Sequence, residues 1–291
     1  MNTFYLILLS MRPKQWVKNL FIFPALMFSQ NLFNLKMTLL SITAFVIFCI
    51  LSGSIYLLND LLDVEEDRKH PLKSYRPIAS GRLNPRVVKP VMGIMSLVSL
   101  GAAFFLNHPF GMVAIAYFII HIAYSLHLKK IVILDVFSIA SGFFLRVIAG
   151  AEAISVPISS WLLICTLFIS LFLALGKRRH ELLLLGENAG QHRKVLEDYS
   201  VGLLDQMVNV VTAGTVLSYS LYTLSSETLE KFHTSNLWLT IPIVLFGIFR
   251  YLYRVYRKEE GGSPEEILLR DRSFLASIIL YILVVMVVLY F

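Results

Sequence analysis

A dense acidic cluster follows a long apolar run at Asn59-Asp60-Leu61-Leu62-Asp63-Val64-Glu65-Glu66-Asp67-Arg68. On a helix, Asn59, Asp63 and Asp67 recur every four residues, and Asp60 shares their face. Carboxylates crowded onto one face repel one another unless a cation lies between them. Hard oxygen ligands suit Mg2+, which binds proteins through one or two carboxylates together with substrate phosphates. The cluster therefore predicts a Mg2+ site formed by Asn59, Asp60, Asp63 and Asp67, with Asp60 and Asp63 as the catalytic carboxylates.

The rest of the chain is too apolar for a soluble domain of 291 residues, because 57% of its residues are hydrophobic and only 15% are charged. Runs long enough to cross a bilayer as helices recur throughout. We therefore expect an all-α, polytopic membrane protein that forms one integral-membrane domain over residues 1–291. The nine predicted transmembrane helices cover residues 19–35, 37–58, 87–106, 109–127, 132–152, 158–176, 204–224, 237–256 and 273–291.

The basic residues indicate how these spans are oriented. If the N-terminus is cytoplasmic, all 26 Lys and Arg residues except Lys36, Arg146 and Lys231 fall in cytoplasmic segments, as the positive-inside rule requires. The acidic cluster then faces the cytoplasm. The net charge of +7 mostly reflects this orientation. Because the basic residues are dispersed among the spans, we expect no nucleic-acid partner.

Basic side chains near the acidic cluster are candidates for binding anions. Lys73 and Arg76 follow it and are suited to phosphate oxygens that a metal leaves free, or to anchoring on anionic lipid headgroups. Lys14 and Lys18 flank Trp16, an aromatic residue typical of the membrane interface. We expect these two lysines to bind the phosphate of a lipid arriving from the bilayer, with interfacial anchoring as the alternative.

A charged residue also lies inside the fifth predicted span. Arg146 is costly there unless it faces a polar cavity or a partner. Asp135 lies eleven residues earlier, close to three helical turns, so both side chains share a face. Arg146 is therefore predicted to line the site, or else to form a structural ion pair. Tyr124, at the end of the fourth span, is a weaker candidate for binding substrate.

The acidic cluster resembles a motif of the UbiA-type intramembrane prenyltransferases. Members of that family are nine-helix bundles in which an NDxxDxxxD motif between helices two and three binds Mg2+-diphosphate. The motif is unbroken here at Asn59, Asp60, Asp63 and Asp67. The resemblance implies the same fold and the same use of Mg2+.

A narrower resemblance rests on three further segments, and it runs from residue 12 to about residue 200, with 264–272 also similar. These segments look like those of the branch that transfers phosphoribose to polyprenyl phosphate, the decaprenyl-phosphate 5-phosphoribosyltransferases. They are RPKQWVKN at 12–19, RPIASG at 76–81 and SGFFLRVIAG at 141–150.

The connection after the sixth span departs from the prenyl-transferring members of the family. Those enzymes carry a second motif, DxxxD, between helices six and seven, and none occurs in residues 177–199. The segment is basic instead, which suits a donor with an additional phosphate, such as phosphoribosyl pyrophosphate. Basic segments are also common on cytoplasmic faces. In the connection after the sixth span, the candidate substrate-binding residues are Lys177, Arg178, Glu181, Arg193, Glu197 and Tyr199.

We hypothesise a Mg2+-dependent glycosyltransferase of a bacterial inner membrane that transfers 5-phosphoribose from phosphoribosyl pyrophosphate to a polyprenyl phosphate, in the synthesis of a cell-envelope glycolipid precursor. The expected partners are these two substrates and the bilayer, with a homo-oligomer as a further option. One alternative is a UbiA-type aromatic prenyltransferase that uses polyprenyl diphosphate. A second is a secondary transporter, although transporters place coupling residues at the bilayer midplane rather than at its edge.

Overall fold

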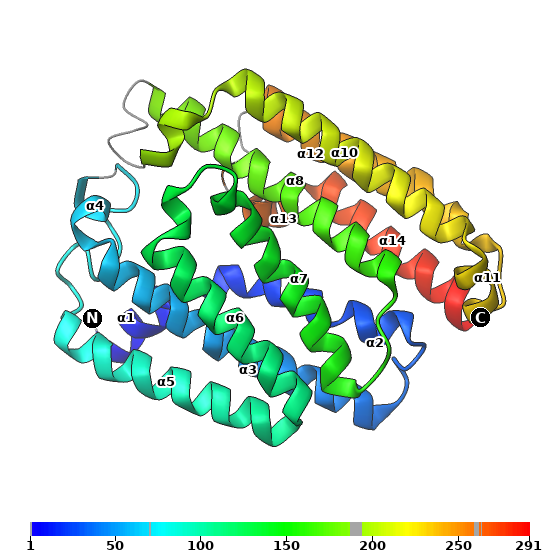
Figure 1. The fold of residues 1–291 in the computed structure, drawn as a ribbon, viewed down its shortest axis with the longest axis horizontal. Helices are drawn as coiled ribbons and strands as arrows, with labels where there is room; N and C mark the ends of the chain where they lie inside the picture. The colour runs from blue at the N-terminus through cyan, green and yellow to red at the C-terminus, as the bar shows by residue number, and fades with distance from the viewer. Residues whose placement is uncertain (1, 70, 187–193, 259–261, 263) are drawn as a thin grey trace.

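The computed structural model describes residues 2–69, 71–186, 194–258, 262 and 264–291. Within these ranges the chain is helical and contains no strand, which confirms the predicted all-α class. The long helices run along the bundle in Figure 1. They are α3 (Leu35–Leu62), α5 (Pro85–Leu106), α6 (His108–Leu126), α7 (Leu134–Ile154), α8 (Ser160–Leu185), α10 (Val201–Leu224), α12 (Ile241–Arg257) and α14 (Arg272–Tyr290).

Shorter elements join the long helices or lie at their ends. Asparagine, serine and aspartate side chains cap several long helices by accepting a backbone N–H, as Asn107 does at α6 and Asp271 at α14. The short elements are α1 (Thr3–Ser10), α2 (Pro24–Phe28), α4 (Val64–Lys69), α11 (Ser226–Phe232), α13 (Pro264–Arg270) and the 3-10 segments η1 (Pro13–Ile22), η2 (Leu128–Lys130), η4 (Lys194–Asp198) and η5 (Asn236–Thr240).

Eight helices in the described part of the chain are long and apolar enough to cross a bilayer, with η5 and α12 counted as one. They coincide within a few residues with eight of the nine predicted spans, except that α8 is longer. Their outward faces carry large apolar side chains such as Leu97 and Phe105, which are 74% and 95% exposed. Such faces suit contact with lipid tails, so the protein is a multi-pass membrane protein.

The first predicted span, 19–35, is not a single helix. Pro24 lacks an N–H group and begins the short α2, and Gln30 adopts a positive φ of 57° beyond its end. The segment nevertheless crosses the bundle. Arg12 bonds to Asp60 near the end of α3, whereas Gln30 donates to the carbonyl of Leu289 near the end of α14. The irregular segment 13–28 therefore supplies a ninth crossing.

Helix α7 lies at the centre of the bundle (Figure 1). Residues of α7 belong to two apolar cores, one shared with α8, α10 and α12 and the other with α3, α5 and α6. The segment η1 approaches α7 so closely that a Cβ atom at Gly150 would lie 2.0 Å from the carbonyl oxygen of Ile22. A glycine is therefore required where these two backbones meet.

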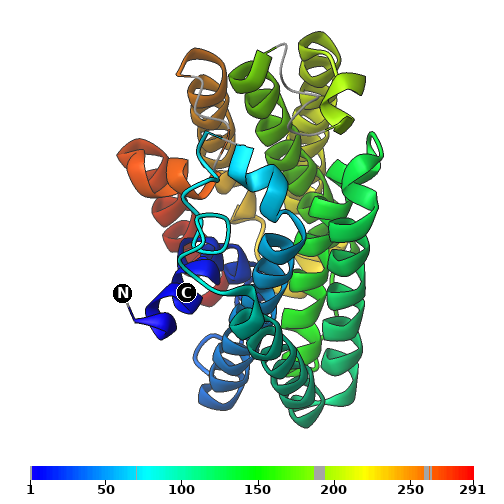
Figure 2. The same cartoon turned by 90° about the vertical axis from the view of Figure 1, so that its left-hand side faces the viewer.

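The acidic cluster lies at the end of the bundle that carries α4. Figure 2 looks onto this end, with α4 and the segment that follows it over the middle of the bundle. The expectation of one continuous helix through Asp67 was wrong, because α3 ends at Leu62 and Asp63 is its C-cap residue. Asp has a low helix propensity, and the break turns α4 back toward the bundle.

A second correction concerns residues 177–185, which were expected in a loop. They continue α8 to Leu185. Strong helix formers occupy the segment, and Arg178 pairs with Glu181 one turn later at 2.5 Å. The extra turns carry Lys177, Arg178 and Glu181 on a rigid helix.

Candidate active site

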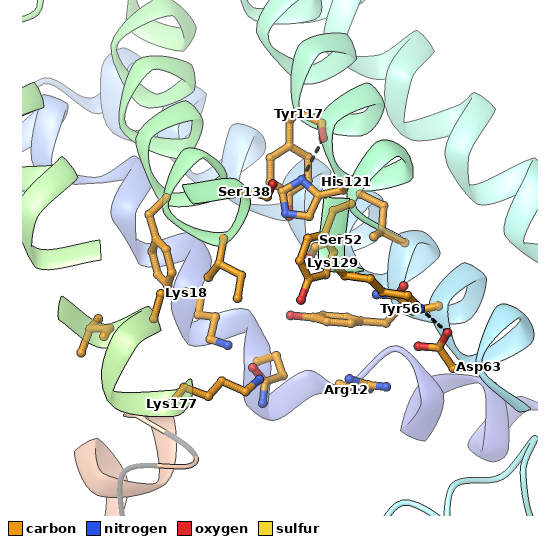
Figure 3. A pocket seen from close by; sticks show the side chains of 18 of the residues that line it. Arg12, Lys18, Ser52, Tyr56, Asp63, Tyr117, His121, Lys129, Ser138 and Lys177 are labelled. Carbon is orange, nitrogen blue, oxygen red and sulfur yellow. Dashed lines mark hydrogen bonds and ion pairs between the residues drawn. The ribbon is translucent and has the colours of Figure 1, made fainter. Parts of the chain in front are cut away.

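A cavity of about 220 Å³ opens between α3, α6, α7, α8 and η1 (Figure 3). Its wall includes nine of the predicted site residues, namely Lys18, Asn59, Asp63, Lys73, Arg76, Tyr124, Arg146, Lys177 and Glu181. Its other lining residues are Arg12, Gln15, Ser52, Ile55, Tyr56, Tyr117, His121, Lys129, Ser138, Ile139, Phe143, Leu173 and Ala174.

The carboxylates of the acidic cluster are bound by basic side chains from other elements. Asp60 is buried and accepts hydrogen bonds from Arg12 and, at 3.2 Å, from Nη1 of Arg76. The same Nη1 lies 2.5 Å from Asp67, which is also buried. Asp63 accepts from Lys129, as Figure 3 shows. Within the described residues these carboxylates form no metal cage, because guanidinium and ammonium groups lie among them.

Two oxygen atoms of the cluster nevertheless lack partners. Oδ1 of Asn59 and Oδ2 of Asp60 are buried and accept no hydrogen bond from the residues that the structure describes. A buried polar oxygen without a partner is costly. Both are hard oxygen donors on adjacent residues beside the cavity, which is the chemistry that Mg2+ prefers. The residues present therefore fit a divalent cation.

The environment of Asp67 is less polar than that of a surface carboxylate. Burial raises the pKa of its carboxyl group, whereas the charge of Arg76 and its hydrogen bond act in the opposite direction. A buried carboxylate gains from a nearby cation because the cation offsets the loss of hydration. Arg76 fills that role between Asp60 and Asp67.

Arg146 lies in the deep wall of the cavity and is 4% exposed. Its Nε donates to Oδ1 of Asn19 at 2.7 Å, its Nη1 to the carbonyl of Gly142 at 2.8 Å and its Nη2 to the hydroxyl of Tyr117 at 2.6 Å. Asn19 in turn donates to Ser52 at 3.3 Å. This network holds α3, α6, α7 and η1 around the cavity.

Arg178 and Tyr199 do not line the cavity. Arg178 is fully buried and donates to Asp135 and to Glu181, each at 2.5 Å, and to Tyr124 at 3.2 Å. Tyr199 donates to the other oxygen of Asp135 at 2.8 Å. Burial raises the pKa of Tyr199, and the hydrogen bond to Asp135 adds to this effect. Arg178 therefore holds Glu181 and Tyr124 in place, and Tyr199 holds Asp135. A direct substrate contact from Arg178 or Tyr199 stays a prediction.

The other predicted residues have different outcomes. Lys14 and Glu197 are exposed and absent from the cavity wall, and Arg193 lies outside the described residues. Asp135 shares no ion pair with Arg146, since its carboxylate binds Arg178.

Several residues of the wall were not predicted from the sequence. Arg12 and Lys129 carried a detectable signal, because they are basic residues at the ends of apolar runs. Ser52, Tyr117 and His121 lie inside apolar helices, where periodicity alone does not separate a cavity from a packed core. Their roles depend on the neighbours that the fold supplies.

These features define a polytopic helical membrane protein in which an acidic cluster and several Lys and Arg residues surround one cavity. The model of the UbiA prenyltransferase family matches residues 19–182. The chain belongs to this family.

The chain is similar over most of its length to curated members of one branch. It is 33% identical over 273 residues to the decaprenyl-phosphate phosphoribosyltransferase of Mycolicibacterium smegmatis, covering 90% of this chain and 86% of that protein. It is 33% identical over 271 residues to the protein of the same name from Corynebacterium glutamicum, covering 90% of this chain and 80% of that protein.

Solved structures share the fold. A UbiA homolog from Archaeoglobus fulgidus bound to GPP and Mg2+ superposes with a TM-score of 0.73 at 20% identity, covering 98% of this chain and 100% of that one. The apo structure of a UbiA homolog from Aeropyrum pernix superposes with a TM-score of 0.67 at 16% identity, covering 92% of this chain and 98% of that one. At these identities the likeness concerns the fold.

Proposed function

We propose that this protein is a Mg2+-dependent glycosyltransferase that moves 5-phosphoribose from phosphoribosyl pyrophosphate to a polyprenyl phosphate. The product would be a precursor of cell-envelope glycolipids. The similarity to curated decaprenyl-phosphate phosphoribosyltransferases over 90% of the chain supports this choice of reaction.

The observation that carries the proposal is the polar character of the deep wall. Arg146, Tyr117 and His121 line the cavity together with Ser52 and Ser138. These groups bond to one another or to neighbouring oxygen atoms, and a prenyl chain would leave their remaining hydrogen-bonding capacity unused. A phosphorylated sugar brings hydroxyl and phosphate groups that match them, so the wall favours a sugar donor.

The acidic cluster would hold Mg2+ through Asn59, Asp60, Asp63 and Asp67. When bound, the ion would neutralise negative charge that develops on the departing pyrophosphate. Arg12, Arg76 and Lys129 now neutralise the same carboxylates. We infer that these cations turn from the carboxylates to the donor phosphates when the metal and the donor bind together.

The remaining basic groups have assigned roles in this scheme. Lys73 and Lys177 would bind donor phosphates alongside Arg76, with Glu181 and Tyr124 held in place by Arg178. Lys18 on η1 would receive the phosphate of the lipid, and the exposed Lys14 would attract it from the surface. Charge-assisted hydrogen bonds of this kind fix both reactants in one geometry.

In the reaction, the bond between ribose C1 and the pyrophosphate oxygen breaks, and an oxygen of the polyprenyl phosphate forms a new bond to C1. Pyrophosphate leaves with the electron pair. The acceptor phosphate is already anionic near neutral pH, so no strong general base is required. The surrounding Lys and Arg side chains would stabilise the charge that moves between the two phosphate groups.

The distribution of Lys and Arg supports a location in a bacterial inner membrane, with the N-terminus and the cavity mouth facing the cytoplasm. Phosphoribosyl pyrophosphate is a charged, water-soluble donor that would enter from that side. The lipid would enter from the bilayer, with its apolar tail along the outward faces of the helices.

Mass spectrometry of the lipid products tests the proposal. Detergent-solubilised protein would be incubated with Mg2+, phosphoribosyl pyrophosphate and decaprenyl phosphate. We expect the lipid to gain one phosphoribosyl unit, and an Asp60→Asn, Asp63→Asn double variant to form none. Transfer that persists undiminished in this variant would contradict the assignment of the acidic cluster.

The family also supports a second candidate, an aromatic prenyltransferase that uses a polyprenyl diphosphate. The same preparation would be offered decaprenyl diphosphate and 4-hydroxybenzoate. Gain of a prenyl chain on the aromatic ring, with no phosphoribosyl lipid formed, would select this candidate. A transporter is disfavoured because the carboxylates lie at the end of the spans rather than at mid-bundle.

A further inference from the structure

His121 lies on the deep wall of the cavity (Figure 3), and the scheme above assigns it no particular atom of the substrate. Its Nδ1 lies 2.9 Å from the carbonyl oxygen of Tyr117, and its ring packs on the Tyr117 ring with centroids 4.0 Å apart. A carbonyl oxygen can only accept, so Nδ1 carries the hydrogen. In the neutral imidazole, Nε2 is then a hydrogen-bond acceptor.

The acceptor atom of His121 is open to the cavity. Among the residues that the structure describes, Nε2 has no hydrogen-bond partner, and it is not one of the buried polar atoms without a partner. Two hydroxyl groups of the cavity wall already donate to backbone carbonyl groups. Ser138 donates to Leu134 at 2.6 Å, and Ser52 donates to Cys49 at 3.3 Å. Nε2 of His121 is therefore placed to receive a hydrogen from a ligand.

The neighbouring helix fixes the position of the ring. A Cβ atom at Gly142 would lie 2.7 Å from Cε1 and 2.9 Å from Nε2 of His121. The carbonyl of Gly142 accepts from Arg146 at 2.8 Å, which holds that stretch of α7 in place. The ring thus occupies a space that exists only because residue 142 has no side chain.

The depth of His121 separates it from the groups that bind phosphate. Lys129 and Asp63 lie at the α4 end, whereas His121 precedes the end of α6 by five residues, or about 7.5 Å of helix rise. The wall at that depth offers neutral groups from Ser52 and Tyr117 besides His121, together with Arg146, which donates to Asn19, Gly142 and Tyr117. Charged side chains at the α4 end can bind the phosphates of a sugar phosphate. The neutral acceptor of His121, deeper in the cavity, can then bind a hydroxyl of the same molecule.

We propose that Nε2 of His121 accepts a hydrogen bond from a ring hydroxyl of the sugar-phosphate donor, and that His121 thereby determines specificity for ribose over deoxyribose. The assignment rests on the proposed function, because it places the sugar between the acidic cluster and the deep wall. In this assignment His121 contacts the sugar ring, whereas the Lys and Arg residues contact the phosphates.

Competition by three sugar phosphates tests the role of His121. Ribose 5-phosphate, 2-deoxyribose 5-phosphate and 3-deoxyribose 5-phosphate would each inhibit donor consumption by the full-length protein. We expect ribose 5-phosphate to inhibit at a concentration about 3- to 10-fold lower than at least one deoxy sugar, as for one lost hydrogen bond. This ratio should fall to about 1 in His121→Leu and persist in His121→Gln, whose amide oxygen can accept.

Gly142→Ala provides a second variant, since its methyl group displaces the imidazole without removing it, and it should also reduce the ratio. Equal inhibition by all three sugars in the unsubstituted protein, or an unchanged ratio in His121→Leu, would overturn the proposal. If the protein consumes no phosphoribosyl pyrophosphate, binding is measured from the thermal unfolding midpoint. Binding of ribose 5-phosphate with discrimination would then support the role of His121 and contradict the proposed reaction, and no binding would contradict both.

Discussion

The guanidinium Nε of Arg146 donates a hydrogen bond to the Oδ1 atom of Asn19 across 2.7 Å, with both residues buried. The bond joins α7 to the irregular segment η1 and brings together two parts of the chain that lie 127 positions apart. A cation inside a membrane bundle persists only when its N–H groups are satisfied. Arg146 meets that condition with three acceptors on three elements.

Replacing Arg146 by leucine is expected to lower the free energy of unfolding by about 2–6 kcal/mol. Oδ1 of Asn19 and the hydroxyl of Tyr117 lose a donor, and each buried group left unsatisfied costs about 1–3 kcal/mol. Thermal unfolding in detergent measures the effect. Arg146→Lys is the matched variant, because it keeps the charge but not the planar array of donors, and it should lose less. Equal unfolding temperatures for Arg146→Leu and the unsubstituted protein would contradict this interpretation.

The contact between Gly150 and Ile22 predicts a steric effect. A Cβ at Gly150 would lie 2.0 Å from a backbone oxygen, so Gly150→Ala should destabilise the protein by at least about 1–3 kcal/mol, as overpacking does. Gly101 is the control, because it lies in α5 where an added Cβ atom would meet nothing within 4 Å. Gly101→Ala should be neutral or stabilising by up to about 1 kcal/mol. A larger loss in the Gly101 variant than in the Gly150 variant would refute the prediction.

The apolar runs predicted the all-α class and eight of the spans, because length and hydropathy suffice to define a membrane helix. The same signal failed at residues 19–35, where Pro24 breaks a run that hydropathy alone presents as continuous. It also failed at residue 177, where helix α8 continues beyond the apolar stretch. A polar helix outside the bilayer carries no hydrophobic signal that would distinguish it from a loop.

The candidate site was only partly predictable for a related reason. The NDxxDxxxD spacing is local, so Asn59, Asp60, Asp63 and Asp67 could be assigned from sequence. The partners of these residues are distant, as Lys129 is from Asp63, and only the fold brings them together. Arg178 was proposed from its charge, and only the fold reveals that it is buried beside Asp135 and bonded to Glu181 and Tyr124.

The buried contact between Arg178 and Asp135 predicts that Arg178→Met is among the more damaging substitutions. Removal of one partner leaves the Asp135 carboxylate without its cation, which typically costs about 3–5 kcal/mol. Arg257 is a suitable comparison, since it is exposed at the end of α12. Arg257→Met should change the unfolding temperature little. If both variants unfold alike, Arg178 does not stabilise the site in the way its geometry indicates.

Tyr199 gives the same network a dependence on pH. Burial raises the pKa of its phenol in the folded protein, above the value of about 10 expected for the unfolded chain. Its contribution is therefore fully present below about pH 10 and is lost as the pH rises toward the folded-state pKa. The difference in unfolding free energy between the unsubstituted protein and Tyr199→Phe should shrink from pH 9 to pH 11. A constant or growing difference would rule out a phenol that remains protonated in the fold.

The position of Asp67 in the acidic cluster predicts how the transfer activity depends on the Mg2+ concentration. Asp67 is buried against Arg76, whereas its neighbour Glu66 is exposed and lies outside the motif spacing. Asp67→Asn removes one charged oxygen ligand, so the Mg2+ concentration for half-maximal transfer should rise by about tenfold or more. Glu66→Gln removes the same charge one residue away and should leave that concentration within about twofold. Chelation with EDTA should abolish transfer in all three proteins, and added Mg2+ should restore it. Equal shifts in the two variants would mean that net charge near the membrane, rather than ligation by Asp67, determines the response to Mg2+.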